Sequence, residues 1–418
     1  MSNTEVIQLE AVLSRANMQA AWAAVKRNDG SAGVDRKSIE QTLKHLAVHW
    51  PLVRHKLQTG TYSPAAVRAV AIPKSQGGTR ILGIPTVQDR LIQQALHQVL
   101  NASLDSSMSE HSYGFRPKRS AHDAVTTARG YVAAGKSWVV DIDLRNFFDQ
   151  VNHDRLMSML SRRIADKRIL QLIGRYLRAP MRQADGTQNK RTRGTPQGGP
   201  LSPILANLYL DPLDVELAVR GIAFVRYADD IVLFCASERA AKRALENVKA
   251  WLKKALDLEI NDEKSGTGRS ENTQLLGFRI HAQGDVSPSP KAIEKLKTTV
   301  RALWSARQSK TSEALRDQWQ QYIRGWWNYF RYANDQRDVE GLSGWIRRHM
   351  RKCFWQRWHG AKGRYNALHQ MGIRGKVLKI ASTKLGAWPM SIHPVVNTAL
   401  RTSVLNRYGF TIPWQLVA

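Results

Sequence analysis

The chain has 418 residues, of which 43% are hydrophobic and 23% are charged. This composition is that of a protein with several folded units, and it excludes a largely disordered chain. Lys and Arg number 63 against 34 Asp and Glu, which gives a formal net charge of +29. An excess of this size favours a polyanionic partner, most often nucleic acid. With only two cysteines, a disulfide framework and a cysteine-based zinc site are excluded.

The spacing of apolar residues predicts the order of helices and strands. A helix over 7–26 is followed by turn-forming residues at 28–33, and strands at 66–72 and 79–84 flank a hairpin turn at 74–78. The elements expected beyond this hairpin are helices at 87–101 and 121–134, a buried strand at 138–143, a helix at 201–219, strands at 222–227 and 231–235, and helices at 292–303, 312–332 and 341–358. Because antiparallel strand pairs come early and helices dominate late, we expect an α+β domain followed by an all-α domain.

The last third of the chain is basic and rich in tryptophan. Between Gly341 and Ala418 there are thirteen Lys and Arg and no Asp or Glu, and nine of the 13 Trp lie at or beyond Trp304. We expect most of these Trp side chains in the core of a helical bundle. Since a merely soluble surface mixes charges of both signs, the absence of acid predicts a polyanion-binding region; a solvated basic face is the alternative.

Membrane attachment and secretion are not expected. The N-terminus has no basic segment followed by an apolar core, and no run of about eighteen apolar residues occurs. The sequence therefore predicts a cytoplasmic protein.

Four Asp residues, on one predicted hairpin and on one further predicted strand, are candidates for catalysis. Asp229 and Asp230 lie at the turn between two apolar strands, and Asp141 and Asp143 lie in a third apolar strand. A divalent cation is the natural partner of such carboxylates, because burying an unpaired charge costs on the order of several kcal/mol. Two cations about 4 Å apart activate a hydroxyl and stabilise a leaving phosphate oxygen. Together with the positive net charge, this pattern predicts two-metal phosphoryl transfer on nucleic acid; an ordinary Asp-Asp hairpin turn is the alternative.

The segment Tyr227–Asp230 resembles the Tyr-x-Asp-Asp motif of reverse transcriptases, with the Ala that group II intron-encoded enzymes favour at its second position. Seven further segments resemble motifs of this family in the same order, namely 72–74 with 79–90, 112–117, 141–149, 194–203, 258–265, 275–278 and 325–330. The resemblance covers nearly the whole chain, and it is strongest to the short bacterial group IIC intron enzymes, which lack an HNH endonuclease domain.

This resemblance implies a right-hand polymerase architecture. The domains expected from it are an N-terminal extension at 1–62, fingers and palm at 63–286, a helical thumb or maturase domain at 287–368, and a basic DNA- and RNA-binding domain at 369–418. It implies an RNA-directed DNA polymerase that uses an RNA template, a DNA primer and dNTPs, and that assists the splicing and mobility of its own intron RNA at a target DNA. The implied cofactor is a pair of Mg²⁺ ions, with Mn²⁺ as a substitute, and the implied location is the bacterial cytoplasm or nucleoid.

The resemblance also implies roles for single residues. The expected catalytic residues and metal ligands are Asp143, Leu144, Asp229 and Asp230. Asp141 competes with Asp143 because both side chains project from the same face of a strand, but the family has an aromatic residue five positions after the catalytic Asp, which favours Asp143 with Phe148. That ring would exclude a ribose 2′-hydroxyl.

Two larger groups of residues are expected to bind substrate. The residues implied at the dNTP site are Arg68, Lys74, Arg80, Phe148 and Gln197. The residues implied in nucleic-acid contacts are Arg116, Lys118, Arg119, Tyr227, Lys264, Arg347, Arg348, Arg351 and Lys352. The loop at 28–35 resembles a segment that covers the template in non-retroviral reverse transcriptases, with an ordinary loop as the alternative.

Three other functions stay open at this point. The same polymerase could serve DNA repair or phage defence, the chain could be a non-enzymatic RNA-binding maturase, or it could be a plain DNA-binding protein.

Overall fold

The computed structural model describes residues 7–73, 78–306 and 309–415. The chain forms two compact units, Met1–Arg269 and Ser270–Ala418. This boundary lies before a short hairpin, β9 (Phe278–Ile280) and β10 (Val286–Pro288), that the sequence had assigned to the fingers and palm. Because β9 and β10 pair with each other, and Phe278 packs against aromatic side chains of the following helices, the hairpin belongs to the second unit.

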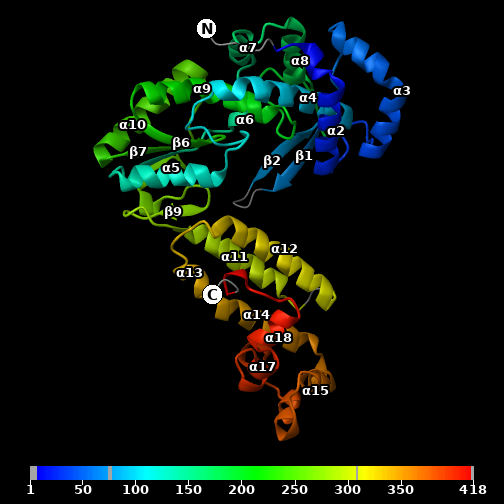
Figure 1. Ribbon diagram of the computed structural model, residues 1–418, viewed down its shortest axis with the longest axis vertical. Helices are drawn as coiled ribbons and strands as arrows, with labels where there is room; N and C mark the ends of the chain where they lie inside the picture. Colours follow the sequence, from blue (N-terminus) through cyan, green and yellow to red (C-terminus); the bar gives the residue numbers. More distant parts are fainter. Residues whose placement is uncertain (1–6, 74–77, 307–308, 416–418) are drawn as a thin grey trace. The chain divides into compact units, whose positions relative to one another are not determined.

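A four-stranded antiparallel sheet is the centre of the first unit. Its strands run in the order β6-β7-β3-β8 and are β3 (Trp138–Ile142), β6 (Ala223–Tyr227), β7 (Asp230–Cys235) and β8 (Gly266–Arg269). The helices α5 (Ala121–Ala133) and α10 (Glu238–Trp251) pack against it (Figure 1). Strands β6 and β7 are almost wholly buried, which accounts for their continuous apolar runs.

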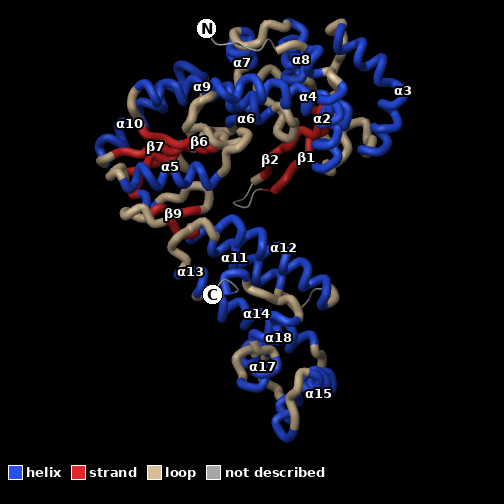
Figure 2. The backbone as a smooth tube through the Cα atoms, viewed as in Figure 1, coloured by secondary structure: helices blue, strands red, loops and turns tan. Residues whose placement is uncertain are grey.

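A second sheet in the same unit contains the predicted hairpin (Figure 2). Its strands run in the order β2-β1-β4-β5 and are β1 (Val67–Pro73), β2 (Thr79–Ile84), β4 (Met181–Arg182) and β5 (Gln188–Asn189). Strands β1 and β2 are antiparallel, as the sequence predicted, with Arg68 opposite Ile84. Lys74, which the sequence placed in the turn between them, lies outside the described residues.

The helices of this unit and the central sheet bury one continuous apolar core. The helices not yet named in this unit are α1 (Leu9–Val12), α2 (Arg15–Asn28), α3 (Ile39–Gln58), α4 (Val87–Leu104), α6 (Phe147–Gln150), α7 (His153–Ser161), α8 (Lys167–Arg178) and α9 (Ser202–Val219). Helix α9 contributes more of its residues to this core than a surface helix would, because most of its apolar side chains and four of its polar ones are buried.

The second unit is largely helical. Its longer helices are α11 (Pro290–Leu303), α12 (Ser312–Phe330), α14 (Leu342–Arg357) and α15 (Gly360–Gln370). Shorter helical segments are α13 (Arg337–Glu340), η4 (Gly375–Ser382), α16 (Ala387–Met390), α17 (Pro394–Ala399) and α18 (Thr402–Arg407). Trp304, Trp319 and Trp355 are fully buried in its core, which confirms the expectation that these rings are structural.

The predicted elements agree with the observed ones to within a few residues, except at the first helix. The helix predicted over 7–26 is broken at Leu13 and Ser14, where the Ser14 side chain caps α2. Several observed elements were not predicted, among them helices α3, α7, α8 and α15 and strands β4, β5, β8, β9 and β10. In the described residues, no helix is long and apolar enough to cross a membrane.

Candidate active site

The register of the central sheet brings the predicted catalytic carboxylates together. In the pairing of β3 with β7, Asp141 lies opposite Val232 and Ile142 lies opposite Ile231. Asp143 follows Ile142 directly and Asp230 precedes Ile231, so both lie at the same end of this strand pair. Asp229 is in the two-residue loop that joins β6 to β7, because Tyr227 pairs with Asp230 across it.

The carboxylates are close enough to influence one another's protonation. Burial, followed by the charges of Asp229, Asp141 and Asp143, raises the pKa of Asp230 to about 6. Burial and the neighbouring Asp143 raise the pKa of Asp141 to about 6. Burial likewise raises the pKa of Asp229, whereas the positive charge of Arg80 opposes this rise. The cluster is therefore a concentration of negative charge that a cation would relieve.

The donor set fits hard divalent cations, because Mg²⁺ and Mn²⁺ prefer carboxylate oxygens. In residues 7–73, 78–306 and 309–415, no three acidic, His or Cys side chains converge closely enough to form a finished metal site. The backbone positions of Asp143, Asp229 and Asp230, and the raised pKa values of Asp141, Asp229 and Asp230, are thus the observations that support a metal centre.

Backbone contacts fix the end of β3 at Asp143. The Ser265 hydroxyl accepts a hydrogen bond from the Asp143 N–H at 3.0 Å, and the Asn261 N–H donates to the Asp143 carbonyl at 2.7 Å. Leu144 is buried and forms a bridge with Ile260. The segment at 260–265, which the sequence singled out only through the resemblance, therefore holds the strand that carries Asp143.

Three of the predicted dNTP-binding residues line one open pocket of about 520 Å³. These are Arg80 on β2, Phe148 on α6 and Gln197 in the loop before α9. Arg80 Nε donates to Gln197 Oε1, and the Gly83 N–H donates to the Gln197 carbonyl at 2.8 Å. Pairing between β2 and this loop thus brings together residues that are more than 100 positions apart.

Gly198 shows why the loop before α9 needs a glycine. Its φ is +119°, and a Cβ there would lie 3.0 Å from the Gly83 carbonyl oxygen. The loop can approach β2 this closely only without a side chain.

The two neighbouring Phe residues, Phe147 and Phe148, differ in burial. Phe147 is buried in the core, whereas Phe148 is half-buried and lines the pocket, with the ring centroids 5.2 Å apart. Asn146 precedes them with a φ of +46°, which turns the chain from β3 into α6. The ring of Phe148 is therefore presented to the pocket by a sharp turn five residues after Asp143.

The loop after α2 forms another wall of the pocket, and sequence reasoning did not identify what holds it. Arg90 on α4 donates through Nη2 to the carbonyls of Gly30 and Ser31, at 3.2 and 2.8 Å. Asn28, Gly30, Arg90 and Phe115 all line the pocket. The motif around Arg90 was noted for its resemblance, but no role was assigned to its side chain.

Arg68 lies on β1 and is not part of the pocket lining. Its Nε is buried and has no hydrogen-bond partner among the described residues. Its charge also contributes to lowering the pKa of Arg90, an effect that is smaller than that of burial. Arg68 and Arg90 are thus two cations close to each other beside the pocket.

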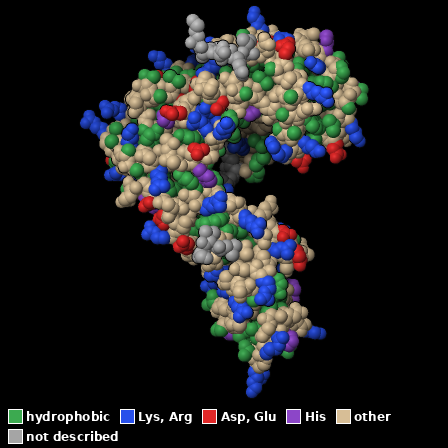
Figure 3. Space-filling view, in the orientation of Figure 1, with side chains coloured by type: hydrophobic (Ala, Val, Ile, Leu, Met, Phe, Trp, Pro, Cys, Tyr) green, Lys and Arg blue, Asp and Glu red, His purple; other side chains and the backbone are tan. Residues whose placement is uncertain are grey.

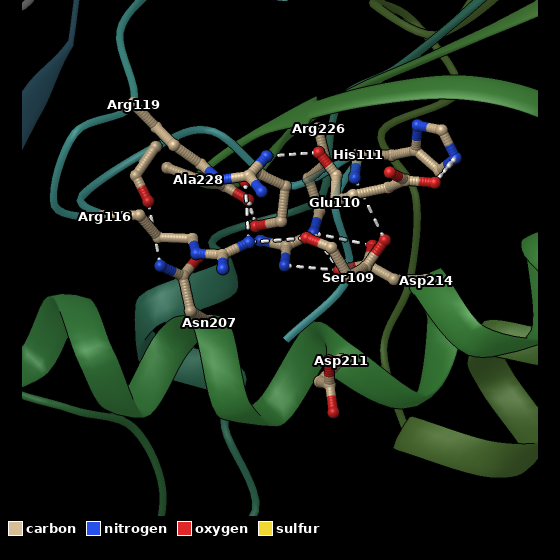
Figure 4. Close-up of polar contacts among 12 residues, drawn as sticks. Ser109, Glu110, His111, Arg116, Arg119, Asn207, Asp211, Asp214, Arg226 and Ala228 are labelled. Carbon is tan, nitrogen blue, oxygen red and sulfur yellow. Dashed lines mark hydrogen bonds and ion pairs between the residues drawn. The ribbon is translucent and has the colours of Figure 1, made fainter. Parts of the chain in front are cut away.

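Arg116 is the predicted nucleic-acid residue whose position differs most from the expectation. Its side chain is buried and donates to the Asp105 carboxylate at 2.7 Å, to the Asp105 carbonyl and to the Ser112 carbonyl. It also donates to the Ser109 carbonyl (Figure 4). The guanidinium thus holds the segment before the Tyr-Gly-Phe motif. Such burial is at odds with a phosphate contact, and Arg116 has no part in the proposals below.

The other predicted contacts of the first unit are accessible. Lys118 and Lys264 are exposed, and Tyr227 is half-buried. Arg119 lies over the ring of Tyr113, with the guanidinium carbon 5.4 Å from the ring centroid. These positions are compatible with contacts to a nucleic acid.

The four basic residues predicted on α14 are half-buried, so they are less accessible than a free surface cation. They are Arg347, Arg348, Arg351 and Lys352. Arg347 donates to Gln415, Arg348 Nε donates to the Ser391 hydroxyl at 3.2 Å, and Arg351 Nε donates to the Leu400 carbonyl at 3.2 Å. Burial lowers the pKa values of Arg347 and Arg351. These guanidiniums tie α14 to the last segments of the chain, so they are structural before any nucleic acid binds.

More accessible cations lie on α15 and η4. Lys362, Lys376 and Lys379 are exposed and line a shallow hollow of about 450 Å³ together with the exposed ring of Tyr365. The visible face of this part of the chain carries Lys and Arg and no Asp or Glu in Figure 3.

Two family models match the chain. The model described as reverse transcriptase (RNA-dependent DNA polymerase) matches residues 72–280, and the model described as the group II intron maturase-specific domain matches residues 293–372. The chain therefore belongs to the group II intron-encoded reverse transcriptase and maturase family. This confirms the family and the polymerase fold that the sequence motifs predicted.

Curated relatives share parts of this architecture. Protein YkfC of Escherichia coli is 33% identical over 271 residues, which are 56% of this chain and 71% of that protein. The group II intron-encoded protein LtrA of Lactococcus lactis is 40% identical over 159 residues, covering 38% of this chain and 26% of LtrA. The putative COX1/OXI3 intron 1 protein of Saccharomyces cerevisiae is 35% identical over 160 residues, which are 38% of this chain and 19% of that protein.

Proposed function

We propose that the chain is an RNA-directed DNA polymerase that extends a DNA primer on an RNA template. The observation that carries this proposal is the joint placement of Asp143, Asp229 and Asp230 at one end of the central sheet, with Arg80 close enough to influence Asp229. Arg80 also lines the pocket with Phe148 and Gln197. Carboxylates for metals and a cation for a triphosphate thus occur in one place.

In the proposed reaction, the primer 3′-oxygen forms a bond to the α-phosphorus of a dNTP, and the bond to the pyrophosphate oxygen breaks. Asp143, Asp229, Asp230 and the Leu144 carbonyl would hold two divalent cations, Mg²⁺ or Mn²⁺. When bound, such cations lower the pKa of the attacking hydroxyl and stabilise charge on the leaving group.

The chain's own residues would select and orient the nucleotide. Arg80 would donate to the triphosphate, with Lys74 and Arg68 as further cations, and Gln197 would donate to the sugar. Phe148 would leave no room for a 2′-hydroxyl and so favour dNTPs over rNTPs. Lys118, Arg119, Tyr227 and Lys264 would contact the template and primer.

A second role, in the splicing and mobility of a group II intron RNA, is supported by the match of residues 293–372 to the maturase-specific domain. The acid-free segment from Gly341 supports it as well, because such a segment attracts the phosphates of folded RNA. A target DNA would be the further partner in mobility. The same polymerase acting in DNA repair or phage defence is the competing assignment.

The experiment that tests the polymerase proposal is extension of a labelled DNA primer on RNA and on DNA templates of the same sequence, with dNTPs and Mg²⁺. We expect full-length product on the RNA template, and none with EDTA. Binding without extension on either template would contradict the proposal and favour a non-enzymatic maturase or a plain DNA-binding protein.

Sequencing the RNA that co-purifies with the protein tests the second role. Enrichment of one structured intron RNA supports splicing and mobility. Enrichment of no intron RNA would favour repair or defence.

A further inference from the structure

A buried arginine lies next to the Ala228–Asp229 loop that joins β6 to β7. Arg226 is the fourth residue of the apolar strand β6, and its side chain is 0% exposed. Its guanidinium donates through Nε and Nη2 to the Asp214 carboxylate, at 2.8 and 2.6 Å. The Asp214 side chain is also 0% exposed, so the two charges neutralise each other inside the protein.

The remaining donor of Arg226 reaches the turn itself. Its Nη1 donates to the Ala228 carbonyl at 2.9 Å and to Asn207 Oδ1 at 2.9 Å (Figure 4). Asn207 and Asp214 are seven residues apart on α9, which sets them on the same face two turns apart. Helix α9 therefore presents two fixed acceptors that orient the planar guanidinium toward Ala228.

Ala228 has a backbone conformation that needs such support. It is the first of the two loop residues between Tyr227 and Asp230, and its φ is +60°. Both hairpin turn types of this length have a positive φ at that position, and both favour Gly, Asn or Asp there. An Ala in the left-handed region is disfavoured, and it persists when the surroundings fix it.

The opposite side of the loop is equally constrained. A Cβ on Gly114 would lie 2.3 Å from the Ala228 nitrogen, so the chain at Gly114 is in direct contact with the loop. Asn207 Nδ2 donates to the Gly114 carbonyl at 2.8 Å, and the Tyr113 N–H donates to the Arg226 carbonyl at 2.8 Å. The amide of Asn207 thus joins both supports of the loop.

We propose that Arg226, oriented by Asp214 and Asn207, is a positioning residue that fixes the Ala228–Asp229 loop and thereby the carboxylates of Asp229 and Asp230. An alternative is that the buried ion pair only stabilises the fold. The two explanations differ in whether loss of the contact between Arg226 and Ala228 displaces the carboxylates of Asp229 and Asp230. The inference rests on the proposed function for its kinetic consequences, but the placement of the carboxylates can be measured without activity.

The test compares Arg226→Lys with the double variant Arg226→Lys, Ala228→Gly. Lysine keeps the charge opposite Asp214 but lacks the fork that reaches Ala228 and Asn207 as well. Glycine adopts the positive φ without help. The matched control is Arg163→Lys, because Arg163 forms an ion pair with Asp211 on the same helix, with Nη2 2.5 Å from Oδ2.

Two readouts are made on the full chain: Mn²⁺ binding by electron paramagnetic resonance titration, and single-turnover extension. We expect Arg226→Lys to weaken Mn²⁺ binding by about 10- to 100-fold. The extension rate at saturating dNTP should fall by about as much, with the dNTP KM within about threefold, because the carboxylates and not the dNTP site are displaced. Adding Ala228→Gly should recover at least about threefold in both readouts, and Arg163→Lys should change neither by more than about twofold.

Unchanged Mn²⁺ binding in a folded Arg226→Lys protein would overturn the proposal, as would a double variant without recovery. If Arg226→Lys does not fold, Asn207→Ala replaces it, and unchanged Mn²⁺ binding in that variant would overturn the proposal equally. A wild-type protein that binds Mn²⁺ in this pattern but extends no primer would contradict the proposed function while supporting the positioning role.

Discussion

Arg80 and Gln197, which are 117 positions apart, form a side-chain hydrogen bond on the wall of one pocket. The bond joins the end of β2 to the loop before α9, and the Gln197 carbonyl is held at the same time by the Gly83 N–H. Gln197 therefore orients the guanidinium of Arg80, which would otherwise sample many rotamers. In the proposed reaction, that cation is directed at a triphosphate.

Gln197→Ala should consequently raise the dNTP KM by roughly 10-fold, because one hydrogen bond to a charged group and one to the sugar are lost. The extension rate at saturating dNTP should change less. Steady-state kinetics on an RNA template measures both. The matched control is Gln94→Ala, since Gln94 lines the same pocket but bonds to Gln98 on its own helix. Equal effects of the two variants would contradict a specific role for Gln197.

Phe148→Ala should increase rNTP incorporation relative to dNTP by at least about 10-fold, because the ring that would meet a 2′-hydroxyl is removed. Single-nucleotide kinetics with dNTP and rNTP pairs measures the ratio. Phe147→Leu is the control: this neighbour is buried in the core, so its replacement should lower Tm and leave the ratio unchanged. If Phe148→Ala prefers dNTP over rNTP as strongly as the wild type does, the ring serves only in packing.

The raised pKa of Asp230 makes a prediction for the metal-free protein. Its value in the folded state is about 6, against roughly 3.9 for an unperturbed Asp. The folded state therefore binds this proton more tightly, and stability is lost as pH rises through the interval from about 4 to 6. In EDTA, Asp230→Asn should have a higher Tm than the wild type at pH 7.5, and the difference should shrink toward pH 4.5.

Excess Mg²⁺ should reverse this order at pH 7.5, because the wild type gains binding energy that the variant lacks. Scanning calorimetry with EDTA and with Mg²⁺ measures both effects. Glu246→Gln, at an exposed carboxylate of α10, is the control. It should show neither the higher Tm in EDTA nor the reversal in Mg²⁺. Identical Tm values for the wild type and Asp230→Asn in EDTA would mean that the carboxylates do not repel one another as described.

The lysines of α15 and η4 should carry part of the salt-dependent affinity for RNA. Replacing Lys362, Lys376 and Lys379 with Gln should flatten the slope of log affinity against log salt by about 1.4–2.1 units, if two or three of them contact phosphates of a single strand. A salt titration of RNA binding measures the slope. Single-turnover extension at saturating primer-template should stay within about twofold. An unchanged slope would exclude these lysines as phosphate contacts.

Much of this arrangement could be predicted from the sequence, for physical reasons that differ between residues. Asp143, Asp229 and Asp230 stood out because charged residues are rare in apolar strands, and β3, β6 and β7 were recognisable by their β-branched and aromatic runs. Helix α8 could have been found as well, since its apolar residues follow a helical period from Ile169 to Leu177.

Other features depend on distant contacts that no local pattern reveals. Helix α3 exposes Leu43, Val48 and Leu52 and contains Pro51, which obscures its periodicity. The burial of Arg116 follows from Asp105 and the carbonyls around it. The ion pair of Arg226 is an exception that the sequence could have indicated. A lone arginine in an apolar strand requires a buried acidic partner.

Rapid-quench extension of a DNA primer on an RNA template, by the wild type, Asp143→Asn and Asp141→Asn, tests the central claim most directly. The account predicts single-turnover product for the wild type in Mg²⁺, a loss of about 1,000-fold or more for Asp143→Asn, and a loss within about 10-fold for Asp141→Asn, with primer-template affinity within about threefold in all three. Wild-type rates in Asp143→Asn together with inactivity in Asp141→Asn would contradict the assignment of the metal ligand, and no extension by the wild type would contradict the polymerase itself.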